Sequence, residues 1–129
     1  MVFDQKRTRG FSISMAADNK IAVVRFLDRS LNFHISENLR EDLKKTIAEK
    51  AGEGCCGTVL DLSEVGVIDS CGVGLIISAC NQASSMGIAL GLSGVTPLID
   101  RIFDVMRLRR HLKIYASNEE AAAALTVSR

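Results

Sequence analysis

The chain of 129 residues lacks an excess of charge of either sign. It has 16 Lys and Arg against 15 Asp and Glu, so its formal net charge is only +1. Proteins that bind nucleic acid or anionic lipid through a broad electrostatic field are usually far more basic. One basic cluster is present, but it is small and has no aromatic neighbours, and we interpret it as the solvated end of a helix: Arg107, Arg109, Arg110 and His111. Composition therefore predicts neither a nucleic-acid partner nor a membrane partner.

Long apolar runs and paired cysteines are also missing. No apolar stretch approaches the roughly 18 residues of a membrane span, and no apolar signal segment follows the basic start MVFDQKRTRG. We therefore expect a cytoplasmic protein. The cysteines show no CxxC spacing and have no nearby pair of histidines, so the sequence predicts no metal site and reduced, mostly buried thiols at Cys55, Cys56, Cys71 and Cys80.

A correctly placed nucleotide-binding or catalytic motif is absent as well. Residues 52–57, GEGCCG, match GxGxxG, but they follow a predicted helix and precede a predicted strand, the reverse of the arrangement that binds phosphate. Cys71 is predicted at a helix start, where a thiol can be reactive, yet nothing places either histidine of the chain beside it. No P-loop or catalytic lysine motif accompanies Asp61 and Asp69. We predict a binding protein that has no catalytic residues and no cofactor.

Hydrophobic periodicity switches repeatedly between two and about 3.6 along the chain, which predicts an α/β protein. FSISM and IAVVRFL form an N-terminal hairpin around ADNK, and later strand patterns stand at TVLDL, IALGL and LKIY. Helix patterns lie between and after these strands, with start signals at Ser36, Asp69 or Ser70, Thr96 and Ser117, and stop signals at Gly52 and Gly87. This order predicts a mixed central sheet with later parallel strands, packed with about four α-helices. We expect one domain over residues 1–129, with a flexible segment at 1–10.

The segment EVGVIDSCGVG lies where a strand gives way to a helix. Ligand and partner sites in α/β sheets favour the carboxyl ends of strands. From the residues alone, Asp69 or Ser70 is the N-cap of the helix. Gly72 and Gly74 allow either the close approach of another chain or tight packing of the helix on the sheet, and the sequence leaves both open.

The stretch from TVLDL to DVMRL resembles the STAS domain of bacterial anti-sigma-factor antagonists. The motif that carries the resemblance is an Asp-Leu strand end followed by Asp-Ser-small-Gly-hydrophobic-Gly at a helix start. The resemblance implies the STAS fold and phosphorylation of Ser70 by a serine kinase of the histidine-kinase ATPase superfamily that also acts as the anti-sigma factor. It implies that the unphosphorylated protein binds this kinase, that phosphorylation breaks the complex, and that a metal-dependent serine phosphatase resets it.

The resemblance also implies a set of partner-binding residues around the serine: Asn32, His34, Asp69, Cys71, Gly72 and Gly74. Many antagonists carry a glycine and then an acid where this chain has Arg29 and Asn32. We therefore expect the partner's pocket to be charged differently. Cys71 replaces a common serine, which leaves Ser70 as the one hydroxyl of the motif. Two alternatives remain open: a structural STAS subunit of a larger signalling assembly, or an antagonist whose final client is not a sigma factor.

Overall fold

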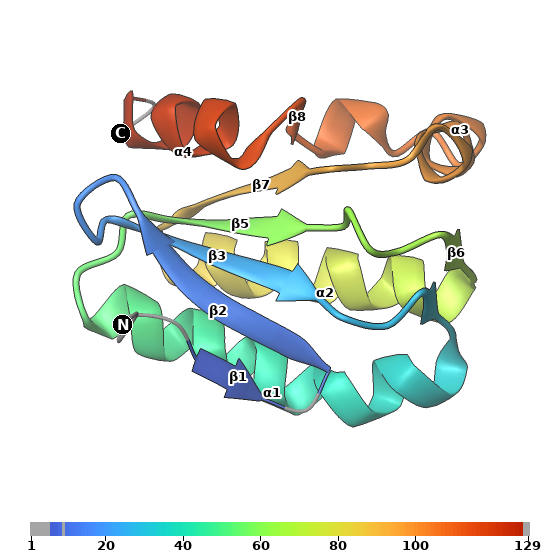
Figure 1. The fold of residues 1–129 in the computed structure, drawn as a ribbon, viewed down its shortest axis with the longest axis horizontal. Coiled ribbons are helices and arrows are strands. Elements are labelled where there is room, and N and C mark those ends of the chain that lie inside the picture. The colour runs from blue at the N-terminus through green and yellow to red at the C-terminus, as the bar shows by residue number, and fades with distance from the viewer. Residues whose placement is uncertain (1–5, 9, 128–129) are drawn as a thin grey trace.

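The computed structural model describes residues 6–8 and 10–127. Within these residues, a six-stranded sheet has the order β1-β2-β3-β5-β7-β8, with helices on both faces (Figure 1). Its first three strands are antiparallel neighbours: β1 (Lys6–Thr8), β2 (Phe11–Ala16) and β3 (Ile21–Phe26). The remaining strands continue the sheet in parallel: β5 (Gly57–Asp61), β7 (Ala89–Ser93) and β8 (Ile114–Tyr115).

Four α-helices connect or follow these strands in the described part of the chain: α1 (Phe33–Gly52), α2 (Ser70–Ser85), α3 (Pro97–Val105) and α4 (Asn118–Val127). A separate two-stranded parallel sheet pairs β4 (Ser30–Leu31) with β6 (Val67–Ile68). The predicted mixed sheet, N-terminal hairpin, parallel later strands and four helices are confirmed.

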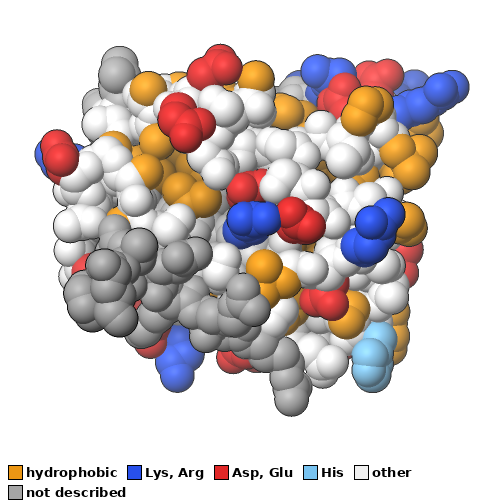
Figure 2. Space-filling view, viewed as in Figure 1, with side chains coloured by type: hydrophobic (Ala, Val, Ile, Leu, Met, Phe, Trp, Pro, Cys, Tyr) orange, Lys and Arg blue, Asp and Glu red, His pale blue; other side chains and the backbone are white. Residues whose placement is uncertain are grey.

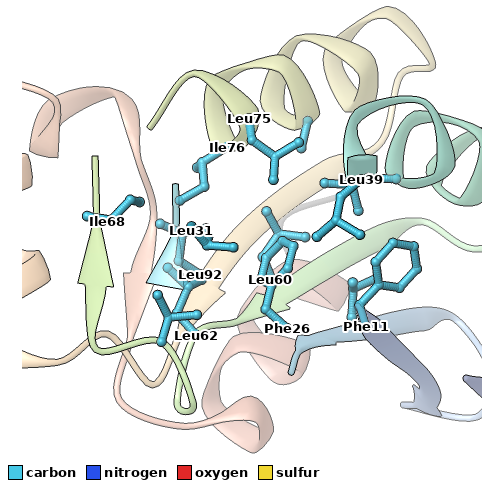
Figure 3. Packing of buried hydrophobic residues seen from close by; sticks show 14 of the residues in the cluster. Phe11, Phe26, Leu31, Leu39, Leu60, Leu62, Ile68, Leu75, Ile76 and Leu92 are labelled. Atoms are coloured by element: carbon cyan, nitrogen blue, oxygen red, sulfur yellow. The ribbon is translucent and has the colours of Figure 1, made fainter. Parts of the chain in front are cut away.

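The main core lies between the sheet and the α1–α2 layer. Figure 3 shows Leu39 of α1 and Leu75 and Ile76 of α2 directed toward strand residues such as Phe26 and Leu60, all of them buried. Burying each such side chain contributes about 1.5–3 kcal/mol. On the opposite face of the sheet, α4 supplies a smaller apolar layer through Ala121, Ala122 and Leu125. This packing holds α2 in place on the sheet and so determines where the first residues of α2 lie.

The first helix begins earlier than its sequence pattern predicted. Asn32 is its N-cap, with extended backbone, and the Asn32 Oδ1 accepts a hydrogen bond from the Ile35 N–H at 3.0 Å. Ser36, the predicted cap, is buried inside the helix and makes no side-chain hydrogen bond. The prediction was wrong because the pairing of β4 with β6 brings the extended chain to an end at Leu31. The helix starts directly after it.

Part of the N-terminal segment 1–10, Lys6–Thr8, is strand β1; residues 1–5 and 9 lie outside the described residues, and the flexibility expected of the segment stays a prediction. One further sequence prediction is corrected by the structure. The basic cluster does not extend α3, which ends at Val105. The chain turns at Arg107, whose φ is +59°, and Arg109–His111 form a separate 3-10 turn. In the part of the chain that the structure describes, no helix is both long and apolar enough to cross a membrane.

Candidate functional site: the start of α2

Ser70 is the first residue of α2 and is exposed. Asp69, immediately before it, is the N-cap and has an extended backbone, with φ −109° and ψ −175°. Of the two caps that the sequence allowed, the structure assigns the role to Asp69. The serine hydroxyl is therefore not used to close the helix, and no hydrogen bond from it is found among the described residues.

The carboxylate of Asp69 joins the beginnings of two helices. Its Oδ1 accepts hydrogen bonds from the backbone N–H groups of Cys71, at 2.9 Å, and Gly72, at 3.0 Å. Its Oδ2 accepts the N–H of Phe33, the first residue of α1, at 3.1 Å. A negative charge is favourable at a helix N-terminus, where unpaired N–H groups and the helix dipole meet it. One side chain thus satisfies donors of both α1 and α2.

The small β4–β6 sheet brings these two helix starts together. Leu31 pairs with Ile68, and the Asp69 N–H donates to the Leu31 carbonyl at 3.2 Å. Parallel strands end at the same edge, so the residues that follow them become neighbours. Sequence reasoning missed the role of Phe33. The signal lay in two short segments, SL and VI, that each end in a buried aliphatic residue directly before a helix cap.

The predicted partner-binding residues of the first loop have different fates. The side chain of Asn32 makes hydrogen bonds to nearby residues: it caps α1, and its Nδ2 donates to the Ser30 Oγ at 3.3 Å. His34 is exposed on the first turn of α1. His34 is therefore open to solvent, whereas Asn32 stabilises the start of α1. Asp69, the residue before Ser70, connects to this region through its hydrogen bond with the Phe33 N–H.

The two glycines of the motif lie in opposite environments. A Cβ at Gly72 would strike the Leu31 carbonyl oxygen and would lie 2.6 Å from Ile68 Cγ1 and 2.8 Å from Leu31 Cβ. Gly72 therefore serves tight packing against β4 and β6. A Cβ at Gly74 would meet nothing within 4 Å. Of these two glycines, Gly72 is thus tightly packed, while Gly74 leaves open space beside α2.

All four cysteines are free thiols. Cys55 is buried and the other three are half-buried, so the predicted burial is complete for one of them only. Burial raises the pKa of Cys80 and of Cys55, which keeps both thiols protonated at neutral pH. Cys71 contributes its backbone N–H to the Asp69 carboxylate.

The other candidate acid, Asp61 at the end of β5, is buried in a polar network. Its Oδ1 accepts the Ser63 N–H at 2.8 Å and its Oδ2 accepts from the Asn118 Nδ2 at 2.9 Å. Asn118 in turn accepts a hydrogen bond from the Ser93 hydroxyl. Asp61 thus orders the loop after β5. Nowhere in residues 6–8 and 10–127 do three or more His, Cys, Asp or Glu gather in a way that could hold a metal ion.

Large exposed hydrophobic side chains gather at the end of the molecule where α2 begins. Figure 2 shows hydrophobic side chains along the right-hand edge, where Figure 1 has β6 and α3. Five of them are between 45% and 74% exposed and come from α1, β6, α3 and the C-cap of α3: Phe33, Val67, Leu98, Val105 and Met106. Apolar exposure on this scale is typical of protein-binding surfaces. We call these five residues the apolar end.

Solved structures with the same fold include anti-sigma factor antagonists. A candidate anti-sigma factor antagonist from Thermotoga maritima is 25% identical, with a TM-score of 0.70 over 90% of this chain and 94% of that one. The Bacillus cell fate determinant SpoIIAA in its phosphorylated form is 20% identical, with a TM-score of 0.64 over 88% and 97%. An anti-sigma-factor antagonist (STAS) domain protein from Planctomyces limnophilus is 15% identical, with a TM-score of 0.76 over 90% and 97%.

The family comparison covers most of the chain. The model of the STAS domain matches residues 12–121. This range begins in β2, includes the Asp69–Ser70 site, and reaches into α4. The strand order, the helix placement and this match agree, and the chain belongs to the STAS domain family.

Proposed function

We propose that this protein is an anti-sigma-factor antagonist that switches partners through phosphorylation of Ser70. Unphosphorylated, it sequesters a serine kinase of the histidine-kinase ATPase superfamily that doubles as the anti-sigma factor. Phosphorylated, it releases that kinase, and a metal-dependent serine phosphatase restores the first state. It acts in the cytoplasm as a binding protein with no catalysis of its own. Membership of the STAS family and the likeness to antagonist structures support this proposal.

The exposed, unengaged hydroxyl of Ser70 carries the proposal. A kinase needs an acceptor oxygen that it can reach without unfolding its substrate. Ser70 provides one, because Asp69 rather than Ser70 caps α2. The hydroxyls of Ser36 and Thr58, by contrast, are buried.

The carboxylate of Asp69 also determines how the charge of a phosphate on Ser70 would act on a bound partner. It already occupies the Cys71 and Gly72 N–H groups, which would otherwise neutralise an anion at the helix start. A phosphoserine brings a charge of about −1.5 to −2 at neutral pH. With those donors occupied and a second negative group adjacent, this charge faces the solvent and any bound partner.

The apolar end supplies the binding surface that such a charge would disrupt. Val67 stands three residues before Ser70, and the backbone of Phe33 is held by Asp69. A partner that covers these side chains removes water from around Ser70. Desolvating an unpaired charge at an interface costs several kcal/mol, so a phosphate there opposes the complex.

Phosphorylation of the purified chain tests the proposal. Each kinase of this superfamily encoded in the source genome is incubated with the chain and ATP, and the product is mapped by mass spectrometry. One kinase should place a single phosphate on Ser70, and Ser70→Ala should abolish it. The kinase should co-elute with the unphosphorylated chain on size exclusion and separate from the phosphorylated one. A dominant phosphate on Ser78 or Ser84 would overturn the proposal, and a phosphorylated chain that stays in the complex would favour the assembly-subunit alternative.

A further inference from the structure

The outer face of α2 borders a groove that extends away from Ser70. The groove encloses about 350 Å³ and is lined by one residue of α1 and five of α2: Lys44, Gly74, Ile77, Ser78, Asn81 and Gln82. The inner face of the same helix packs on the sheet through Leu75 and Ile76, as Figure 3 shows. The groove is therefore on the solvent side of α2, where α1 runs beside it.

The groove is continuous with the phosphorylation site along one helix face. Residues spaced by about 4, 8 and 11 positions lie on the same side of an α-helix. Gly74, Ser78 and Asn81 have this spacing from Ser70. Eleven residues of helix extend about 16 Å, so Ser70 and the groove together form a strip long enough for a segment of a partner protein.

Gly74 opens the beginning of this strip. It is half-buried by its surroundings, yet the position of its missing Cβ is free of neighbours within 4 Å. A helical glycine costs about 0.5–1 kcal/mol relative to alanine, and here the fold gains no packing from it. The bare backbone instead lets another chain approach α2 directly after Ser70.

Lys44 gives the groove a positive charge that nothing in the described chain neutralises. Its side chain is half-buried, and no Asp or Glu among the described residues lies within ion-pair distance of it. Lys50 on the same helix, by contrast, pairs with Glu53 at 3.1 Å. No residue that lines the groove is acidic. The charge therefore suits a carboxylate supplied from outside.

We propose that this groove is a second contact for the kinase that phosphorylates Ser70, and that an acidic side chain of the kinase pairs there with Lys44. The inference rests on the proposed function and adds to it the chemistry of the partner. Opposite charges across an interface select partners and register as well as contributing affinity. The groove thereby fixes the direction in which the kinase lies along α2, with its active site over Ser70.

Charge reversal at neighbouring lysines tests the pairing. The affinity of the kinase that phosphorylates Ser70 is measured by calorimetry for wild type, Lys44→Glu and the matched control Lys45→Glu, whose lysine is exposed and outside the groove. Lys44→Glu should weaken binding about tenfold, equivalent to about 1.4 kcal/mol, and should flatten the salt dependence. Lys45→Glu should change affinity less than threefold. Equal effects of the two reversals, or none, would overturn the inference.

Filling the groove provides a second test that does not depend on charge. Gly74→Gln places a side chain in open space, so its thermal midpoint should equal or exceed that of wild type. Kinase binding should nevertheless fall about tenfold or more. Unchanged binding by a folded Gly74→Gln would contradict the proposed contact while wild-type phosphorylation of Ser70 still supported the proposed function. Failure of every kinase to modify the wild-type chain would overturn the function and this inference together.

Discussion

Asp61 and Asp69 each follow or end a strand on the same side of the molecule, and each uses both carboxylate oxygens. Asp61 bonds to Ser63 and Asn118 and so ties the β5 loop to α4. Asp69 bonds to Phe33, Cys71 and Gly72 and so ties α1 to α2. Their burial separates them, because Asp61 is only 6% exposed whereas Asp69 stands at the surface.

The difference shows that two aspartates with similar hydrogen bonding can have different roles, one in the stability of the fold and one beside an exposed surface. Asp61 itself is buried, and its hydrogen bonds hold the β5 loop and the start of α4 in place, so we expect this network to act on the fold. Around Asp69, the bonds point inward to two helices while Ser70 and Phe33 remain exposed. A site of this second kind combines a rigid support with an accessible surface, as binding requires.

Ser70→Asp should have the largest effect and should act on binding alone. The new carboxylate would have to be desolvated beside Asp69 at the interface, which costs several kcal/mol, or about a hundredfold or more in kinase affinity. At the solvated helix start, it should change stability by less than about 1 kcal/mol. Ser70→Ala, which adds no charge, should bind constitutively. Calorimetry and thermal melts check both variants, and a Ser70→Asp chain that binds like wild type would exclude an electrostatic switch.

Asp61→Ala should have the largest effect on the fold. Its removal leaves the Asn118 amide and the Ser63 N–H without their acceptor in a partly buried network, and such losses cost about 1.5–3 kcal/mol. Urea denaturation measures this change. Below the unfolding transition, kinase affinity should match that of wild type. A loss of affinity in a folded Asp61→Ala chain would mean that the two aspartates are not functionally separate.

Asp69→Ala should moderately lower both the stability of the protein and the rate of Ser70 phosphorylation. Loss of an N-cap costs about 0.5–2 kcal/mol, and release of the Phe33 N–H should loosen the first turn of α1. Phosphorylation of Ser70 should slow, because the exposed surface around it is no longer held in one arrangement. Asp69→Asn retains an oxygen acceptor, so its stability should return toward wild type. Urea denaturation and initial phosphorylation rates separate these outcomes from a purely electrostatic role of the carboxylate.

Gly74→Ala should have the smallest effect on the free energy of unfolding, and in the stabilising direction. Its Cβ enters open space, so the free energy of unfolding should rise by about 0.5–1 kcal/mol, the amount by which alanine is favoured over glycine in a helix. Gly72→Ala is the matched control and should destabilise the protein, because its Cβ meets Leu31 and Ile68. Thermal melts of the two variants should therefore shift in opposite directions.

Local sequence signals predicted the helix ends that depend on a few neighbouring residues. Thr96 caps α3, with Pro97 at its first position, and the Ser117 hydroxyl accepts the Glu120 N–H at 3.1 Å at the start of α4. Gly87, with a φ of +73°, follows the end of α2. These features were predictable because capping bonds close within three or four residues.

The wrong predictions concern positions where a distant segment decides the outcome. Ser36 satisfied the same capping pattern as Thr96, but the pairing of β4 with β6, 37 residues apart in register, ended the extended chain at Leu31 and made Asn32 the cap. Arg107 lies next to α3 in sequence, yet the chain turns there to bring Ile114 beside Leu92. Tertiary pairing outweighs local propensity at such points because it involves more buried contacts.

The sequence by itself determined the order of strands and helices, the Asp-Ser motif at a helix start, and the resemblance that links Ser70 to phosphorylation. Those properties follow from periodicity and from residue types that lie close together in the chain. Only the tertiary structure decided that Asp69 reaches Phe33, that Gly72 is packed while Gly74 is open, and that Lys44 stands unpaired beside α2. Each of these depends on which surfaces meet when α1 and α2 pack on the sheet. The neighbours of a side chain across such a contact come from distant segments, so the local sequence around that side chain does not determine them.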